Sequence, residues 1–322
     1  MNDLVIETND LTKCYGEQVC VAQLCLHVPK GKIYALLGRN GAGKTTTMKM
    51  LLNLVKPTSG FIKIFNDIHL EDASKAYSRI GALIETPGFY DNLTGRENLE
   101  IIARLRGLNS IESVDQALSV VNLDKNDKKI FEKYSLGMKQ RLGIAAAIMH
   151  KPEILILDEP TAVLTPQETE KLFSVLRNMR ADGKSIIIIT HKLNEIKAVA
   201  NRCTILRKGK YIGTVDVAST SAEKLSELMV GRKVNFIVEK DKPQIGDTVL
   251  EVKDLCYKPA HSSKNVLNNV SFNVRRGEIV CIAGIDGNGQ TELVYALSGL
   301  IKHNSGQILL NGEDLSHESI RS

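Results

Sequence analysis

The chain has 322 residues, 43% of them hydrophobic, with 42 Lys and Arg against 37 Asp and Glu. A chain of this length and composition can bury a sizeable core and can form two domains. The net positive charge is small and the charges are interspersed along the chain, so nothing in the composition favours a nucleic-acid-binding protein.

The sequence shows neither a signal peptide nor a membrane-spanning segment. Residues Met1–Glu7 lack a basic segment and an apolar core. The longest aliphatic runs, Ile154–Leu157 and Ile186–Ile189, are far shorter than the about 20 apolar residues that cross a bilayer. The six cysteines include no CxxC pair, and we interpret them as buried thiols in a reducing compartment. Any membrane role is therefore expected to depend on a partner.

A glycine-rich loop is the first motif along the chain that carries chemistry. It follows an expected strand at Ile33–Leu37, precedes an expected helix at Lys44–Leu54, and reads GRNGAGKT. This is the P-loop pattern in the context that it requires. Backbone N–H groups of such a loop curl around phosphates, and the helix presents its positive N-terminus to the same anion. The residues expected to bind a nucleoside triphosphate are Gly38, Asn40, Gly41, Gly43, Lys44, Thr45 and Thr46, and the Thr45 hydroxyl is also expected to bind magnesium.

Two carboxylates follow an aliphatic run further along the chain. Ile154–Leu157 is expected to be a buried strand, and Asp158 and Glu159 come directly after it. Ligands of open α/β sheets bind at the carboxyl ends of such strands. Asp158 is therefore expected to hold magnesium, and Glu159 to orient or deprotonate an attacking water. The apolar run followed by acids is common by itself, but together with the P-loop it indicates a nucleotide-hydrolysing site.

The remaining elements indicate the fold class. Further strands are expected at Ile80–Ile84 and Ile186–Thr190, and a further helix at Gln167–Met179. Strands that alternate with helices of this length predict an α/β fold with a largely parallel sheet.

The sequence also contains an internal repeat. Lys30–Gly38 is echoed by Arg276–Gly284, and Gly43 and Gly60 recur at the same spacing as Gly289 and Gly306. The repeat predicts a complete domain over residues 1–232, a polar linker over 233–247 and the beginning of a second copy over 248–322. Strands are expected in this second copy at Val249–Val252 and Ile279–Ala283, although they lack the rest of their sheet.

The segment Tyr134–Arg141, YSLGMKQR, resembles the signature motif of the ABC (ATP-binding cassette) family. The order of the motifs also matches that family: Tyr15 as the aromatic that stacks on adenine, the P-loop, the signature, the Asp158–Glu159 pair and His191 as the switch histidine. The resemblance implies a P-loop NTPase with a RecA-like core, an N-terminal antiparallel β subdomain and a helical signature subdomain, followed by a truncated second cassette. It implies an ATPase that uses ATP and Mg, with Glu159 and His191 as catalytic residues.

In this family the signature grips the γ-phosphate of ATP held by an opposing cassette. Ser135, Gly137 and Gln140 are therefore expected to bind ATP across a dimer, and the chain, which has one signature, is expected to need a second cassette. Where most cassettes have a glutamine after the strand Ile80–Ile84, this chain has Glu85, which is expected to contact magnesium. Thr165 stands where the family usually has an aspartate that crosses the dimer interface.

The two parts of the chain resemble different branches of the family. Residues 1–160 resemble bacitracin and lantibiotic exporters, whereas residues 160–322 resemble tandem-cassette importers of sugars and nucleosides. Gln290 replaces the P-loop lysine in the second copy, so weaker phosphate binding is expected there. Two explanations stay open. The chain is a truncated chimera of an exporter and an importer ATPase, or it belongs to a divergent natural family that has the sequence features of both.

These resemblances imply an ATPase subunit of an ABC transporter. Closure of a homodimer or heterodimer of cassettes is expected to move a transmembrane permease subunit, with the chain peripheral on the cytoplasmic face of the membrane and no role for nucleic acid. The alternative is a soluble ABC-F-type translation factor, but such proteins carry a long charged helical linker and residues 231–247 are short. The transported substrate and the direction of transport stay open.

Overall fold

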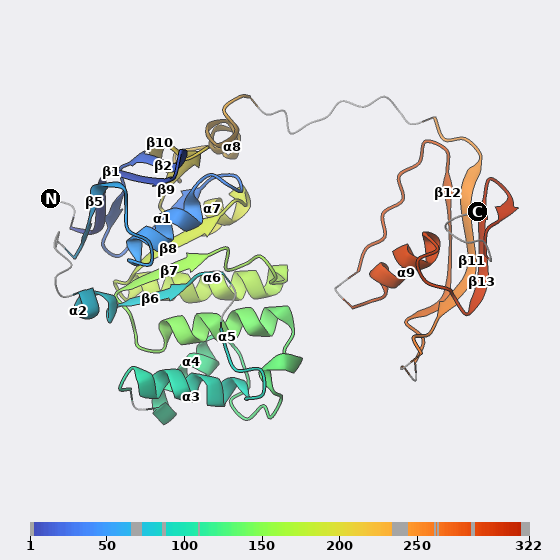
Figure 1. The fold of residues 1–322 in the computed structure, drawn as a ribbon, viewed down its shortest axis with the longest axis horizontal. Coiled ribbons are helices and arrows are strands. Elements are labelled where there is room, and N and C mark those ends of the chain that lie inside the picture. The colour runs from blue at the N-terminus through green and yellow to red at the C-terminus, as the bar shows by residue number, and fades with distance from the viewer. Residues whose placement is uncertain are drawn as a thin grey trace. The chain divides into compact units, whose positions relative to one another are not determined.

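The computed structural model describes residues 3–65, 73–85, 88–108, 110–233, 244–260, 262, 264–284 and 287–316. The chain divides into two compact units, Met1–Val234 (unit 1) and Asn235–Ser322 (unit 2), shown in Figure 1. Each unit has hydrophobic clusters of its own. The linker expected over residues 233–247 falls largely on residues 234–243, which lie outside the described residues.

Unit 1 is built on a mixed sheet with a parallel centre. Its described strands are β1 (Leu4–Tyr15), β2 (Gln18–Leu24), β3 (His27–Pro29), β4 (Ile33–Leu37), β5 (Ser59–Ile64), β6 (Ile80–Leu83), β7 (Ile154–Asp158), β8 (Ser185–Thr190), β9 (Arg202–Arg207) and β10 (Lys210–Asp216). Their order is β3-β1-β2-β10-β9-β4-β8-β7-β6, and β5 pairs with β1. The neighbours β9, β4, β8, β7 and β6 run parallel, whereas β1 pairs antiparallel with β2, β3 and β5. The predicted α/β class, with an antiparallel N-terminal part, is confirmed.

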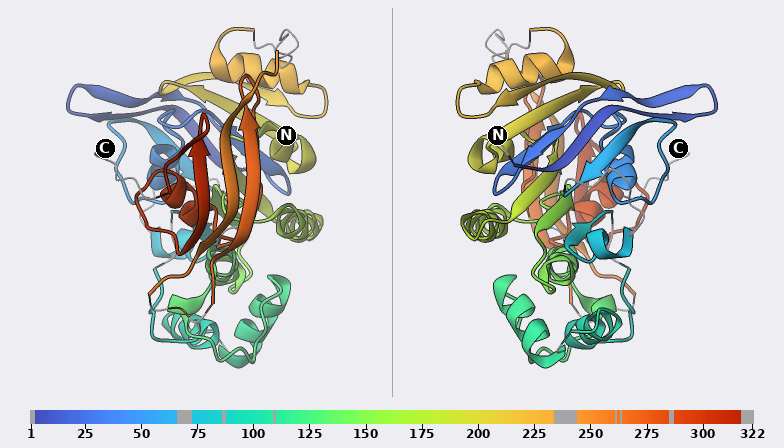
Figure 2. Two further views of the ribbon diagram at one scale, coloured as in Figure 1. Left: turned by 90° about the vertical axis from the view of Figure 1, so that its right-hand side faces the viewer. Right: turned by 90° about the vertical axis from the view of Figure 1, so that its left-hand side faces the viewer.

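The helices of unit 1 complete its layers. They are α1 (Lys44–Leu51), α2 (Ala73–Tyr77), α3 (Gly95–Leu105), α4 (Ser110–Val120), the short 3-10 helix η2 (Phe131–Lys133), α5 (Leu136–Ile148), α6 (Pro166–Ala181), α7 (Leu193–Val199) and α8 (Ala222–Val230). The antiparallel strands and the helices α3 and α4 lie at opposite ends of the unit (Figures 1 and 2). Among the described residues of the chain, none of the helices has the length and apolarity that a membrane span requires.

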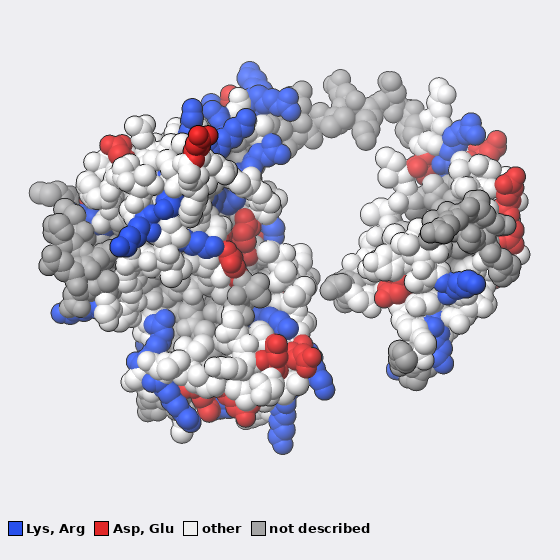
Figure 3. Space-filling view, in the orientation of Figure 1, with Lys and Arg blue, Asp and Glu red and all other residues white. Residues whose placement is uncertain are grey.

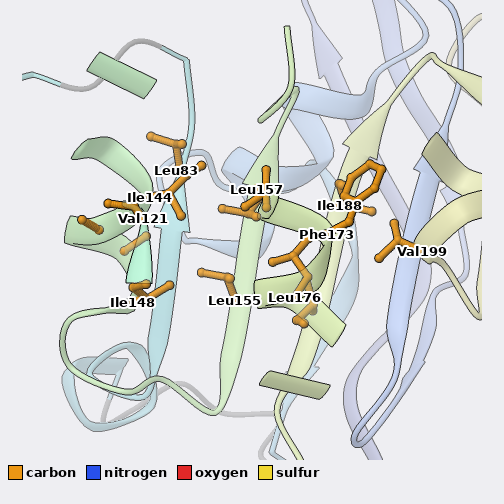
Figure 4. Packing of buried hydrophobic residues seen from close by; sticks show 14 of the residues in the cluster. Leu83, Val121, Ile144, Ile148, Leu155, Leu157, Phe173, Leu176, Ile188 and Val199 are labelled. Atoms are coloured by element: carbon orange, nitrogen blue, oxygen red, sulfur yellow. The ribbon is translucent and has the colours of Figure 1, made fainter. Parts of the chain in front are cut away.

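The central strands are buried on both faces, which explains their unbroken aliphatic runs. Because successive side chains of a strand point to opposite faces, Leu155 and Leu157 pack with Leu176 of α6 in one cluster, part of which Figure 4 shows. Ile156, from the same strand, belongs to the other cluster with Met48 of α1. The sheet is thereby held between two helical layers, and the carboxyl ends of its strands meet along one edge.

The stability of the chain is expected to depend on pH because of His150, which follows α5. Its Nε2 lies 3.1 Å from the Ile80 carbonyl oxygen, and its buried Nδ1 has no hydrogen-bond partner in the described part of the chain. Burial, helped by the nearby charge of Arg106, lowers the pKa of His150 from 6.5 to about 4. Below about pH 6.5 the His150 imidazole is protonated in the unfolded chain but stays neutral in the folded chain. The free energy of unfolding therefore falls as the pH drops from 6.5 towards 4.

We expect thermal unfolding curves to show a smaller loss of Tm across this pH window in His150→Gln than in the wild-type chain. The glutamine amide still donates a hydrogen bond but does not titrate. An equal loss of Tm in both proteins would show that His150 is not responsible.

Unit 2 is a four-stranded antiparallel sheet with one described helix. The strands are β11 (Thr248–Tyr257), β12 (Leu267–Arg275), β13 (Ser305–Leu310) and β14 (Glu313–Asp314), in the order β12-β11-β13-β14, and the helix is α9 (Gln290–Leu297). Its core contains Val252, Leu255 and Ile308 from the strands and Leu293 and Ala296 from α9.

Unit 2 repeats local features of unit 1. Helices α1 and α9 both begin after a glycine with positive φ, 96° at Gly43 and 92° at Gly289. Strands β5 and β13 both carry a glycine, Gly60 and Gly306, where a Cβ would lie 2.5 Å from backbone atoms of β1 and β11 respectively. Only glycine fits at such a close approach of two strands. The repeat found in the sequence is therefore also a repeat of structure.

One predicted strand is wrong. Residues 279–283 match β4 of unit 1 in sequence, yet they form no strand, and the Ile279 side chain is 86% exposed. In unit 1, β4 lies between β8 and β9; among the described residues of unit 2, no strand pairs with this segment. The expectation of buried thiols also needs correction, because Cys281 in this segment is exposed and Cys14, Cys20 and Cys25 are only partly buried. Cys203 and Cys256 are buried as expected.

Candidate functional site

The loop between β4 and α1 is packed against the backbone of neighbouring strands. A Cβ at Gly43 would lie 2.5 Å from the Cys20 carbonyl oxygen, and one at Gly38 would lie 2.6 Å from the Leu206 carbonyl oxygen. Gly41 and Gly43 both have positive φ, which costs glycine little. The glycines thus let the loop curl closely at the N-terminus of α1.

The Lys44 side chain is held inside this loop. The residue is only 6% exposed, and its Nζ donates to the carbonyl oxygens of Gly38 (2.8 Å) and Arg39 (3.3 Å). Burial lowers the pKa of Lys44, and the carboxylates of Glu159 and Asp158 oppose that effect. A cation whose hydrogen bonds go to neutral carbonyls and which lies near the positive end of a helix is well placed to contact an anion.

A hydroxyl and a carboxylate meet beside the loop. Asp158, the last residue of β7, is buried, and its Oδ2 accepts a hydrogen bond of 3.0 Å from Thr45 Oγ1. Burial raises the pKa of Asp158, and the hydrogen bond from Thr45 opposes that rise. A hydroxyl oxygen and a carboxylate oxygen, both of the kind that bind hard cations, therefore lie together next to the phosphate-binding loop.

Glu159 and His191 emerge side by side because β7 and β8 are parallel neighbours. Glu159 Oε1 lies 2.9 Å from His191 Nδ1 and 3.9 Å from Lys44 Nζ. Its other oxygen, Oε2, is buried and has no hydrogen-bond partner among the described residues. A buried acceptor without a partner is costly, so this oxygen is available to a group that enters the site.

Lys44, Thr45, Asp158 and Glu159 line one cavity of about 650 Å³. Of the predicted site residues, it is lined by Asn40, Gly41, Gly43, Lys44, Thr45, Thr46, Glu85, Gln140, Asp158 and Glu159. Glu85 Oε1 also accepts a hydrogen bond of 2.7 Å from Lys49 Nζ. A single cavity thus collects the P-loop, both acids and one residue of the signature helix.

The other predicted residues lie outside the lining of this cavity. Tyr15, at the end of β1, is 49% exposed, and Lys13 Nζ lies 4.8 Å from its ring centre. Ser135 is the N-cap of α5 and accepts a hydrogen bond from Met138 N, while Gly137 lies in the first turn of that helix. His191 lines an adjacent cavity of about 480 Å³, and Gly38 lies beneath the loop against Leu206.

Sequence reasoning missed part of the lining. Gln18, Val19 and Cys20 from β2, Ala162 and Val163 after β7, and the Lys208–Gly209 turn also border the cavity. Ala162 and Val163 lie in the loop after Glu159 that ends at Thr165, and the other residues belong to no motif. The only local signal was Gly209, whose positive φ marks a tight turn and whose Cβ would lie 2.8 Å from the Cys20 carbonyl oxygen.

Charged side chains of both signs are spread over the face of unit 1 that Figure 3 shows. This distribution is consistent with the interspersed charges of the sequence. On that face, the charged groups give no sign of a single basic surface of the kind that typifies nucleic-acid-binding domains.

Comparisons with known proteins identify relatives of both expected types. A family model described as ABC transporter matches residues 21–162 and 267–322. The nucleoside import ATP-binding protein NupA of Lactococcus lactis is 41% identical over 328 residues, which cover 99% of this chain and 65% of that protein. The bacitracin transport ATP-binding protein BcrA of Enterococcus faecalis is 52% identical over 217 residues, which cover 67% of this chain and 70% of that protein. This chain therefore spans less than two thirds of the length of NupA.

A solved structure shows the same fold as unit 1. The dimeric structure of MJ0796, a bacterial ABC transporter cassette, matches with a TM-score of 0.61 at 25% sequence identity, covering 66% of this chain and 98% of that one. The match thus covers nearly all of that cassette.

Proposed function

Since the chain belongs to the ABC transporter family, with the fold of an ABC ATPase cassette, we propose that it binds and hydrolyses ATP to drive substrate movement through a separate membrane subunit. The observation that carries the proposal is the convergence of Lys44, the Thr45–Asp158 pair and Glu159 on one cavity, with His191 hydrogen-bonded to Glu159 beside it. Phosphoryl transfer needs such positioned charges more than it needs covalent chemistry.

The residues around the cavity fit ATP and Mg. The loop amides, the N-terminus of α1 and Lys44 suit the phosphates. Thr45 and Asp158 supply the hydroxyl and carboxylate oxygens that magnesium prefers, and Glu85 is a further carboxylate on the same cavity. Magnesium would neutralise charge that develops on the transferred phosphoryl group.

Glu159 and His191 are proposed as the catalytic pair. The hydrogen bond from His191 holds Glu159 Oε1, and the unpaired Oε2 can accept the proton of an attacking water. Lys44 Nζ lies 3.9 Å from the same carboxylate oxygen.

The signature segment is proposed to serve the ATP of another cassette. Ser135 and Gly137 lie outside the cavity lining, and Leu136 between them is exposed. Tyr15 is proposed as the adenine platform, since its ring is half exposed at the end of β1. A cassette dimer, homomeric or heteromeric, would unite these surfaces, and MJ0796 is described as such a dimer.

The partners and substrate follow from the names of the relatives. NupA is named for nucleoside import and BcrA for bacitracin transport. Together with the sugar importers that residues 160–322 resemble, these names make nucleoside or sugar import and peptide antibiotic export the two candidate substrate classes. The chain would act on the cytoplasmic face of the membrane through a permease subunit. No observation favours a translation factor.

The proposal predicts that the ATPase activity of the purified chain depends on its concentration. Specific activity should rise with protein concentration and then level off, because each ATP needs the signature of a second cassette. Phosphate release measured beside light scattering would test this. Specific activity that is independent of concentration in a demonstrated monomer would overturn the dimer requirement.

A further inference from the structure

We infer that Glu195 is a positioning residue that fixes the Glu159–His191 pair by tying together the two loops that carry these residues. The inference rests on the proposed function, because it assigns a task to the same site. Glu195 lies in the first turn of α7 and does not line the cavity.

Glu195 is the centre of a buried polar network. The residue is 7% exposed, and its Oε1 and Oε2 accept hydrogen bonds from Thr161 Oγ1 (2.6 Å) and Thr190 Oγ1 (2.8 Å). Lys192 Nζ lies 3.1 Å from Oε1. A buried carboxylate is tolerated only when it is paired and hydrogen-bonded, and here both oxygens have partners. The network therefore has a defined geometry.

The network reaches both members of the catalytic pair through the backbone. Thr161 comes two residues after Glu159, and Thr190 directly precedes His191. Thr190 Oγ1 also accepts a hydrogen bond of 3.1 Å from Lys192 N, so the backbone on both sides of His191 is fixed. Lys192 Nζ donates to the Thr161 carbonyl oxygen at 3.1 Å. Glu195 and its partners thus join the loop after β7 to the loop after β8.

The catalytic pair needs such support. Glu159 has a φ of +45°, a conformation that a non-glycine residue keeps only when its surroundings impose it. From the β8 side, the Ile189 carbonyl oxygen accepts a hydrogen bond of 2.9 Å from Glu159 N. The His191 side chain is half exposed, so packing alone does not fix its ring. The Glu195 network supplies the remaining constraint on both residues.

Loss of the network should change turnover rather than ATP binding. Lys44 and Thr45 belong to the P-loop and α1. Among the described residues, neither forms a hydrogen bond with Glu195, Thr161 or Thr190. A displacement of about 1 Å in a catalytic group can lower a rate about a hundredfold. The effect is therefore expected in kcat and not in KM.

Thr190 offers a matched pair of variants. Thr190→Val keeps the shape of this fully buried side chain and removes its hydroxyl, whereas Thr190→Ser keeps the hydroxyl. In the full chain, Thr190→Val should lower kcat by about tenfold to a hundredfold with little change in KM for ATP. Thr190→Ser should stay close to wild type, and Thr161→Val and Glu195→Gln should follow Thr190→Val.

A second readout needs no turnover. The imidazole nitrogen signals of His191 in a long-range ¹H–¹⁵N NMR spectrum of the nucleotide-free chain, assigned from their loss in His191→Gln, report the Nδ1 contact with Glu159. These signals should shift in Thr190→Val and keep their wild-type positions in Thr190→Ser.

The outcomes separate the two proposals. A wild-type chain that hydrolyses no ATP contradicts the proposed function, and the NMR comparison still decides the positioning role. The inference would be overturned if Thr190→Val had the same kcat as the wild-type chain and its His191 signals were unchanged. It would also be overturned if kcat, ATP affinity and Tm fell together while the His191 signals stayed in place, because that pattern indicates only a general loss of stability.

Discussion

Replacing Lys44 with alanine should weaken ATP binding by about tenfold to 150-fold, the equivalent of about 1.5 to 3 kcal/mol for one hydrogen bond to a charged group. Lys44 is buried within the P-loop, and its Nζ donates hydrogen bonds to the carbonyl oxygens of Gly38 and Arg39. It is also the cation that faces Glu159, at 3.9 Å. Its removal would leave two carboxylates, Asp158 and Glu159, beside a triphosphate with less positive charge to offset them.

Titration calorimetry of the full chain with ATP would measure the effect. Lys63→Ala is the control, since Lys63 lies on β5, pairs with Glu7 and does not line the cavity. It removes the same charge from the chain and should leave the affinity unchanged. Affinity of Lys44→Ala within a few-fold of wild type would contradict the assignment of Gly38–Thr45 as the phosphate-binding loop.

The predictions from sequence were most accurate where the chemistry is local. The P-loop specifies its own context, so the strand β4, the loop and the start of α1 at Lys44 could all be located from the spacing of the motif. The aliphatic runs that became β7 and β8 were equally clear, because a strand that is buried on both faces has no polar positions. Parallel pairing then accounts for the approach of Glu159 to His191.

The predictions were least accurate where the structure depends on distant partners. Residues 279–283 have the same aliphatic pattern as 33–37, but they form no strand, since a central strand exists only between its neighbours. The network of Glu195 had no signal in the sequence either. A glutamate in the first turn of a helix is normally solvated and interacts favourably with the helix dipole. Nothing local in the sequence indicates that this glutamate is buried and accepts a hydrogen bond from Thr161.

The dimer-related residues are a third case. Ser135 and Gly137 could be identified only through a family resemblance, because the partner expected for them is ATP held by another cassette. The structure adds that Glu168, in the capping box of α6, lies near Gly137 and within 3.5 Å of Arg141. The signature helix is therefore linked to the first turn of α6, a contact that sequence spacing does not show.

Glu159→Gln should retain ATP and lose turnover by about a hundredfold to ten-thousandfold, the usual contribution of a general base. The amide has the same shape as the carboxylate but cannot take a proton from the attacking water. ATP affinity should be equal or higher, since one negative charge beside the triphosphate is removed. ATP-bound dimers should accumulate, because binding is retained while the hydrolysis that would separate the cassettes is blocked.

Phosphate release and light scattering in the presence of ATP would measure the two effects on the same samples. Glu153→Gln is the control, since Glu153 precedes the same strand but is only partly buried and pairs with Arg79 outside the cavity. Undiminished hydrolysis in Glu159→Gln would remove Glu159 from the catalytic role. Lost hydrolysis together with lost ATP binding would instead place Glu159 among the residues that shape the site, because a general base contributes to the reaction step and not to the retention of the nucleotide.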